Sequence, residues 1–173
     1  MKSKIKIEAK NDLENNDESY YSTSDQSLSV SIVYPKEIPG SLSCKIEEKF
    51  ELKKPYFLLN IDNLTITFEG EDLYLVSIDA YTNLINWESG TISVPEEKTF
   101  GYATLQKSVD DDRESITLNP RFLYDQRHSV LKIELSSTRT DKEEFFKISS
   151  NISIGLSNKT ITSVFIEKLK IKP

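Results

Sequence analysis

Residue types that build reaction centres are scarce in this chain of 173 residues. It has one cysteine, Cys44, and one histidine, His128, which are too few for an internal disulfide or a histidine-rich metal site. Its five glycines form no glycine-rich phosphate loop and no G-x-G-x-x-G motif. The sequence therefore predicts no cofactor and no metal centre.

Long hydrophobic runs are missing as well. No apolar stretch approaches the roughly 20 residues of a membrane-spanning helix, and the basic residues 1–7 are not followed by the apolar segment of a signal peptide. The net charge of −6 leaves no excess of lysine and arginine to neutralise phosphate groups. We therefore expect a cytoplasmic protein that binds neither nucleic acid nor a membrane.

Alternation of hydrophobic and polar residues is what the chain has in abundance, for example in residues 42–52, 64–68 and 74–80. Successive side chains of a β-strand point to opposite faces, so this alternation predicts strands that bury one face. In 42–52 the four-residue spacing of Ile46 and Phe50 also allows a helix. The alternation accounts for more of these residues, and a strand is the favoured interpretation.

The predicted strands follow one another at short, nearly regular intervals, with turn-forming residues between them. The longer ones cover residues 4–9, 29–34, 42–52, 56–61, 64–68, 73–81, 100–105, 130–135, 152–156 and 161–166, and shorter ones cover 91–94, 116–118 and 121–124. About ten strands in a chain of this length predict one all-β domain over 1–173, either an antiparallel two-sheet β-sandwich or an open barrel. We expect at most one short helix, a single turn capped by Thr140 and Glu143.

Charge is distributed unevenly along the chain. Residues 1–10 contain four lysines and one glutamate, and residues 163–173 contain three lysines and one glutamate. Lysines alternate with apolar residues at both ends, which predicts edge strands that lysines protect from pairing with other chains, a docking role being the alternative. Residues 11–27 contain five acids and no base, which predicts a long acidic loop or a disordered segment.

The two residues whose side chains are most often catalytic, a histidine and a cysteine, both have a simple structural explanation. His128 lies close to Asp125 in an expected hairpin turn, where a solvated turn residue is favoured over a catalytic base. Cys44 shares the apolar face of its strand with Leu42 and Ile46. A buried, structural thiol is therefore expected rather than a reactive one.

Aromatic and acidic residues in loops remain as candidates for binding. An aromatic side chain buries a large area and has few rotors to immobilise, so loop aromatics are favoured interface anchors. For Trp87 we favour a position in the core, and for Tyr20 and Tyr21 a position in an interface. The acidic run 110–112 lacks the spacing of a calcium loop, so it is expected to be solvated or to meet a basic partner. The predicted partner-binding residues are Tyr20, Tyr21, Trp87, Asp110, Asp111 and Asp112.

One segment resembles a known domain. The pair Tyr124-Asp125, then Leu131-Lys132-Ile133, then the strands 152–156 and 161–166, is similar to a small bacterial β-hairpin domain of unknown function. That domain carries a Tyr-Asp-x4-Leu-Tyr-Ile strand and a later Gly-Ile-Glu-Ile strand. The resemblance covers about residues 121–171, with Lys132 in place of the tyrosine and no Gly-Ile-Glu in 163–166. It implies β-hairpins here and no particular activity.

Three functional hypotheses are compatible with these features. The leading one is a non-catalytic protein-binding module, most concretely a bacterial immunity protein whose acidic surface covers the basic cleft of a toxin. The first alternative is a structural subunit of a phage or surface assembly, which predicts a stable homo-oligomer. The second alternative is a carbohydrate-binding or glycan-hydrolysing β-sandwich, which predicts a concave face that contains aromatic side chains.

Overall fold

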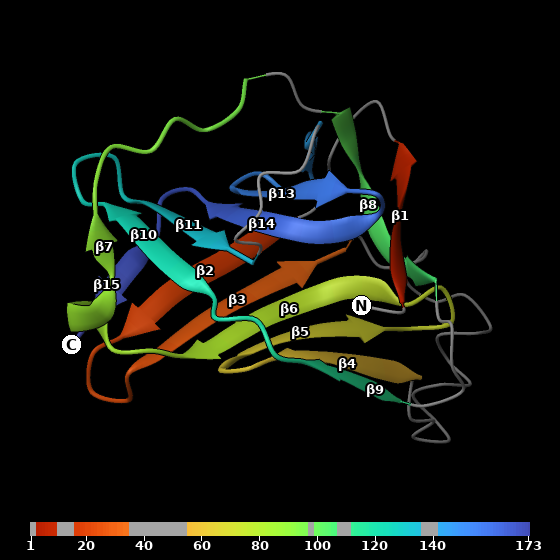
Figure 1. The fold of residues 1–173 in the computed structure, drawn as a ribbon, viewed down its shortest axis with the longest axis horizontal. Coiled ribbons are helices and arrows are strands. Elements are labelled where there is room, and N and C mark those ends of the chain that lie inside the picture. Colours follow the sequence, from red (N-terminus) through yellow and green to blue (C-terminus); the bar gives the residue numbers. More distant parts are fainter. Residues whose placement is uncertain (1–2, 10–15, 35–54, 97–98, 107–111, 136–141) are drawn as a thin grey trace.

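The all-β class predicted from the sequence is confirmed. The computed structural model describes residues 3–9, 16–34, 55–96, 99–106, 112–135 and 142–173, which form fifteen strands and one short 3-10 turn (Figure 1). Within these ranges no helix is long and apolar enough to cross a membrane. The predicted strand 42–52, with Cys44, lies outside the described residues.

Seven strands form a first group, in which each strand is hydrogen-bonded to the next. Their order is β15 (Lys170–Lys172), β2 (Asn16–Ser22), β3 (Ser27–Val33), β6 (Tyr74–Tyr81), β5 (Leu64–Glu69), β4 (Tyr56–Ile61) and β9 (Arg113–Ile116). The hairpin β4–β5 follows the sequence prediction closely, because buried residues alternate with more exposed ones in both strands. Strand β6 covers nearly the predicted residues, but its alternation is interrupted where Val76 and Ser77 are both partly exposed, beside a register shift in its pairing with β5.

Six strands form a second group, which lies across the first in Figure 1. Their order is β7 (Glu88–Ser89), β10 (Arg121–Asp125), β11 (Val130–Glu134), β14 (Thr160–Ile166), β13 (Ile152–Ser157) and β12 (Glu144–Lys147). The hairpins β10–β11 and β13–β14 lie where the sequence predicts them.

Strand β8 (Thr99–Gln106) connects the two groups into one large mixed sheet. It pairs with β12 of the second group, with β6 of the first group through Tyr74 and Thr104, and with β1 (Lys4–Ala9) along its length. The sheet is open, since the path of paired strands begins at β15 and ends at β7 without closing.

The prediction of purely antiparallel sheets is wrong. The pairs β2–β15, β4–β9, β7–β10 and β8–β12 are parallel. Each of them includes a strand of only two to four residues that reaches its partner after a long excursion of the chain. An alternating sequence reports which face a residue occupies and contains no information on strand direction, so these pairings could not be read from it.

Two local predictions are also corrected. The segment 11–27 was expected to be an acidic loop or disordered. Its residues 16–22 instead form strand β2, in which Ser19 and Tyr21 are buried and Glu18 is exposed. Residues 11–15 lie outside the described residues. The helical turn predicted to start at Thr140 lies partly outside the described residues; Glu144–Lys147 form strand β12, and the short helical element is η1 (Leu84–Asn86). Strand pairing decides both cases, since β2 and β12 each gain two hydrogen-bonded neighbours.

The apolar core contains residues of both strand groups. Leu28 and Val30 of β3, Ile66 of β5, and Leu131 and Ile133 of β11 are all fully or almost fully buried in it. Strand β15 is the first strand of the path and pairs with β2 alone, and β1 pairs with β8 alone among the described strands. Both lysine-rich segments are therefore edge strands, as their alternation predicts.

Candidate binding surface

Three segments distant in the sequence meet at one end of the first strand group, at the lower left of Figure 1. They are the turn after β2 (residues 23–26), the turn after β4 (62–63) and the segment after β6 (82–86). The Thr82 N–H donates to the Gln26 carbonyl at 2.9 Å. The Tyr81 N–H donates to the Asn63 carbonyl at 3.1 Å, and the Asn63 Nδ2 donates back to the Tyr81 carbonyl at 2.8 Å. These bonds fasten the end of β6 between the two turns.

A shallow hollow of about 390 Å³ lies between the three segments. Its lining consists of polar side chains and one phenol ring: Asp25, Gln26, Asn63, Tyr81, Thr82, Asn83 and Asn86. Among the described residues that line it there is a single carboxylate and no lysine or arginine. The hollow is therefore rich in side-chain amides and weakly acidic.

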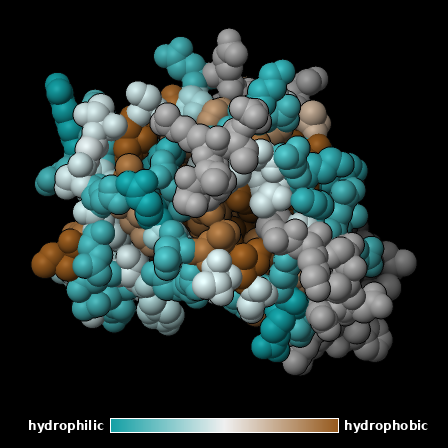
Figure 2. All heavy atoms as spheres, in the orientation of Figure 1, coloured by the Kyte–Doolittle hydropathy of each residue, from teal (hydrophilic) through white to brown (hydrophobic). Residues whose placement is uncertain are grey.

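Two large hydrophobic side chains project from the same segment. Ile85 is 84% exposed and Tyr81 is 78% exposed, and no other large hydrophobic side chain of the described residues is more than 58% exposed. In Figure 2 a hydrophobic projection stands at the lower left, where Figure 1 places η1. Single exposed apolar residues are ordinary, but two such residues four positions apart on one short segment form a candidate contact surface.

Four hydrogen bonds, three of them partly buried, hold this segment in place. The Tyr21 hydroxyl donates to the Thr82 carbonyl at 2.9 Å and accepts from the Leu84 N–H at 3.0 Å. The Trp87 Nε1–H donates to the Thr82 hydroxyl at 3.0 Å, and Asn83 caps η1 by accepting the Ile85 N–H at 3.0 Å. The backbone that carries Tyr81 and Ile85 is thus attached to the core by side chains on either side.

Trp87 is the centre of the aromatic cluster below this segment. Its ring lies 4.8 Å from that of Tyr21 on β2, and 5.9 Å and 5.7 Å from those of Phe122 and Tyr124 on β10. Trp87 therefore packs between the two strand groups, in the core as favoured from the sequence. Tyr21 is buried as well, so the prediction that it lies in an interface is wrong; its place in an alternating strand, unrecognised in the sequence, directs it inward.

Tyr20 points to the other face of β2 and does not line the hollow. It is half-buried, and the Lys172 ammonium lies 3.7 Å from the centre of its ring. The same ammonium lies 3.8 Å from a Glu18 carboxylate oxygen. Tyr20 thus forms a cation–π contact that fastens β15 to β2, and its ring face is already covered.

Only the last residue of the acidic run 110–112 is described. Asp112 is exposed and lies 3.3 Å from Arg113 Nε, and it accepts a long hydrogen bond of 3.4 Å from the Tyr56 hydroxyl. Asp110 and Asp111 lie outside the described residues. Asp112 precedes β9, which lies away from η1 in Figure 1. Of the described partner-binding candidates, Tyr21 and Trp87 are in contact with each other, inside the core, and Asp112 lies apart from them. Within the described ranges, no three His, Cys, Asp or Glu side chains form a group suited to a metal ion.

His128 and Asp125 form a turn, as predicted. Asp125 is buried, and its carboxylate accepts the backbone N–H groups of Ile92, Arg127 and His128 at 3.0–3.2 Å, together with a 2.8 Å contact to His128 Nδ1. The bond from His128 contributes most to lowering the pKa of Asp125 to about 2, outweighing burial, which would raise it. This carboxylate organises the turn and holds the chain after β7 against β10.

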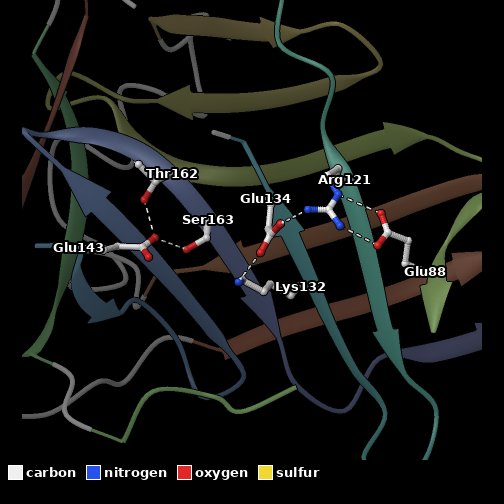
Figure 3. Close-up of polar contacts among 7 residues, drawn as sticks. All are labelled: Glu88, Arg121, Lys132, Glu134, Glu143, Thr162 and Ser163. Carbon is white, nitrogen blue, oxygen red and sulfur yellow. Dashed lines mark hydrogen bonds and ion pairs between the residues drawn. The ribbon is translucent and has the colours of Figure 1, made fainter. Parts of the chain in front are cut away.

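A row of polar side chains crosses the outer face of the second strand group (Figure 3). Arg121 donates to both Glu88 oxygens, at 2.9 and 2.7 Å, and to Glu134 at 3.1 Å, and Lys132 donates to the other Glu134 oxygen at 2.6 Å. The bond from Arg121 holds the pKa of Glu88 below its ordinary value. These ion pairs join β7, β10 and β11, and the guanidinium of Arg121 is paired with two carboxylates of the same protein.

A second polar contact continues this row. Glu143 accepts hydrogen bonds from the Thr162 and Ser163 hydroxyls at 2.5 and 2.6 Å. A Cβ atom on Gly155 would collide with the Glu143 carboxylate and the Ser163 hydroxyl, so the glycine makes room for this contact. Each charged group of the row thus already has a hydrogen-bonding partner within the protein.

No family model and no curated protein matches this sequence. The candidate surface therefore rests on geometry. The sequence pointed to Tyr21 and Trp87, but not to Ile85 or the amides. The only available signal was the pair Asn83 and Asn86, which could equally have marked an ordinary turn.

Proposed function

We propose that the protein is a non-catalytic protein-binding module and that Tyr81 and Ile85 anchor its partner. The observation that carries this proposal is the exposure of these two side chains on a segment held by Tyr21 and Trp87. Binding energy in protein interfaces is concentrated in a few large anchor residues that are surrounded by a polar rim. Tyr81 and Ile85 would be the anchors, and the amides beside them the rim.

Rigidity supports this assignment. Ordering a mobile loop costs free energy on association, so a surface that is already fixed binds more tightly than a flexible one of the same composition. The backbone of residues 81–87 is bonded to two neighbouring turns and to two buried aromatic side chains. Little further ordering of this backbone would be required.

Charge favours a basic partner. The chain has a net charge of −6, and Asp25 is the one charged side chain among the described residues that line the hollow. In its most specific form the proposal is an immunity protein of the bacterial cytoplasm that covers a basic cleft of a toxin. The two strand groups would serve as the layers of a β-sandwich scaffold.

Affinity capture from the native host, followed by binding measurements with the purified partner, tests the proposal. The double variant Tyr81→Ser, Ile85→Ser should lose the partner, while Val33→Ser should retain it because Val33, 58% exposed, lies at the opposite end of β3. Equal capture by the two variants would contradict the proposal. Light scattering provides a further criterion, since a homo-oligomer that the double variant dissociates would indicate an assembly subunit instead.

A further inference from the structure

The lining of the hollow has an unusual chemical composition. Four of its seven side chains are carboxamides: Gln26, Asn63, Asn83 and Asn86. Each carboxamide offers both hydrogen-bond donors and an acceptor, whereas a carboxylate only accepts and a lysine or arginine only donates. Such a lining fits a ligand whose own groups both donate and accept, which is the property of hydroxyl groups.

Much of this hydrogen-bonding capacity is unused within the protein. The side chains of Gln26 and Asn86 make no hydrogen bond to another described residue. Asn83 uses its Oδ1 to cap η1, and Asn63 uses its Nδ2 on the Tyr81 carbonyl, so the Nδ2 of the first and the Oδ1 of the second stay available. A ligand in the hollow would meet donors and acceptors from all three segments.

Tyr81 is the one aromatic residue among the described residues that line the same hollow. Its side chain is 78% exposed although its backbone is bonded to Asn63 on both its N–H and its carbonyl. A pyranose ring has one or two faces made of C–H groups, and such a face gains contact area by stacking on an aromatic ring. The exposed ring can thus contact the C–H face of a sugar, and the amides beside it can bind the hydroxyl groups.

Other ligand classes match the lining less well. A phosphate or another anion would require cationic groups, and no lysine or arginine is among the described lining residues. A divalent cation would require several carboxylates, and Asp25 is the single one there, with one oxygen already accepting the Ser22 hydroxyl at 2.9 Å. The hollow is open and shallow, with a volume of about 390 Å³, so a ligand there would keep one side exposed to solvent.

From this geometry we infer that the hollow is a binding site for a neutral saccharide, which stacks on Tyr81 and is hydrogen-bonded by Gln26, Asn63, Asn83 and Asn86. This inference goes beyond the protein-binding function and can fail separately from it. Ile85 projects from the same segment but does not line the hollow, so it serves the protein contact alone.

Glycan-array binding by the full chain, followed by titration of the labelled protein with neutral methyl glycosides and their oligosaccharides in two-dimensional NMR, tests the inference. We expect a saccharide to shift the amide resonances of Gln26 and Asn86 most. Tyr81→Ala should weaken binding about tenfold, and Asn86→Ala about threefold to tenfold, the range that one hydrogen bond contributes. The matched control Ile85→Ser should leave the saccharide affinity unchanged. The side chains of Tyr81, Ile85 and Asn86 are all exposed, and thermal unfolding of each variant verifies that it folds.

Three results would overturn the inference. One is the absence of both array signals and resonance shifts at millimolar glycoside. Another is saccharide binding that Tyr81→Ala and Asn86→Ala leave unchanged, which would place the site elsewhere. The third is a shift of the same resonances by an arginine-rich peptide but by no saccharide, which would assign the hollow to a basic side chain of a protein partner. Loss of partner capture in Ile85→Ser with intact saccharide binding would separate the two proposals.

Discussion

The indole N–H of Trp87 donates a hydrogen bond to the side-chain hydroxyl of Thr82 at 3.0 Å, and this bond joins the core to the exposed surface. On its inner side Trp87 contacts rings from β2 and β10. On its outer side it fixes the residue that follows Tyr81. Changes in the core at this position are therefore expected to alter the presentation of Tyr81 and Ile85.

Trp87→Phe should lower stability by about 1–3 kcal/mol, because it removes a partly buried hydrogen bond and leaves space beside Phe122. Each kcal/mol should lower Tm by roughly 2–4 °C in a chain of this size. Urea and thermal unfolding measure the change. The control is Tyr124→Phe, which keeps the ring beside Trp87 and should be nearly neutral. An unchanged stability in Trp87→Phe would contradict the role assigned to the bond with Thr82.

Tyr21→Phe tests the second support of the same segment. The substitution keeps the ring but removes the hydroxyl that serves both the Thr82 carbonyl and the Leu84 N–H. Two partly buried backbone groups lose their partner, so we expect a loss of about 1–3 kcal/mol in urea unfolding. Tyr20→Phe is the matched control on the adjacent residue and should change stability by less than about 0.5 kcal/mol. A neutral Tyr21→Phe would contradict the assigned role.

Gly101→Ala should loosen β1. A Cβ atom at this position would lie 2.6 Å from Ile7 Cγ2 and 2.7 Å from the Glu8 carbonyl oxygen, and the latter belongs to the backbone and cannot rotate away. Overpacking of this kind costs about 1–3 kcal/mol. Amide hydrogen exchange should be faster in residues 4–9. Gly90→Ala, where nothing lies within 4 Å of the added Cβ, is the control and should leave the exchange of these residues unchanged.

Acid should destabilise the protein through Asp125. The pKa of this carboxyl is lowered from 3.8 to about 2 in the folded state, so between these values the unfolded chain binds more protons than the folded one. Stability is therefore retained above about pH 4 and lost as the pH falls toward 2. Asp17 and Glu88, whose pKa values are also lowered, contribute in the same direction.

Urea unfolding at a series of pH values from 2 to 6 measures this effect. Asp125→Asn cannot titrate, so the variant should be less stable at neutral pH and should lose less stability on acidification than the unaltered chain. An unchanged slope in Asp125→Asn would show that this carboxyl has an ordinary pKa in the folded protein. An NMR titration of the Asp125 side chain gives the same information directly.

The alternation of hydrophobic and polar residues correctly predicted the strands whose buried positions are occupied by hydrophobic side chains. Strands β4, β5 and β6 and the hairpin β13–β14 appear at nearly the expected residues, because Leu, Ile, Val and Phe occupy the buried positions. Strand β2 was missed because its inward residues Ser19 and Tyr21 are not typical core residues and the strand lies in an acidic, polar stretch of sequence. Composition suggested a loop there, and pairing with β3 overrides it.

The candidate surface could not have been predicted in the same way. Its hollow combines residues between Asp25 and Asn86 that come from three separate turns, and only the order of strands places these turns together. Ile85 illustrates the difficulty, since an isoleucine in a short helical turn would ordinarily be assigned to the core, yet it is 84% exposed. The sequence did indicate Trp87 and Tyr21, which proved to be the supports below this surface.

The placement of β1 and β15 has a consequence for folding during synthesis. Strand β1 pairs with β8, whose residues are made almost 100 positions later, and β2 receives β15 only after residue 172 has emerged from the ribosome. Until then both strands present bare edges to other nascent chains, and such long-range pairing is slow. The acidic side chains of Asp17 and Glu18 on β2 would repel identical chains on a polysome before β15 pairs with this strand.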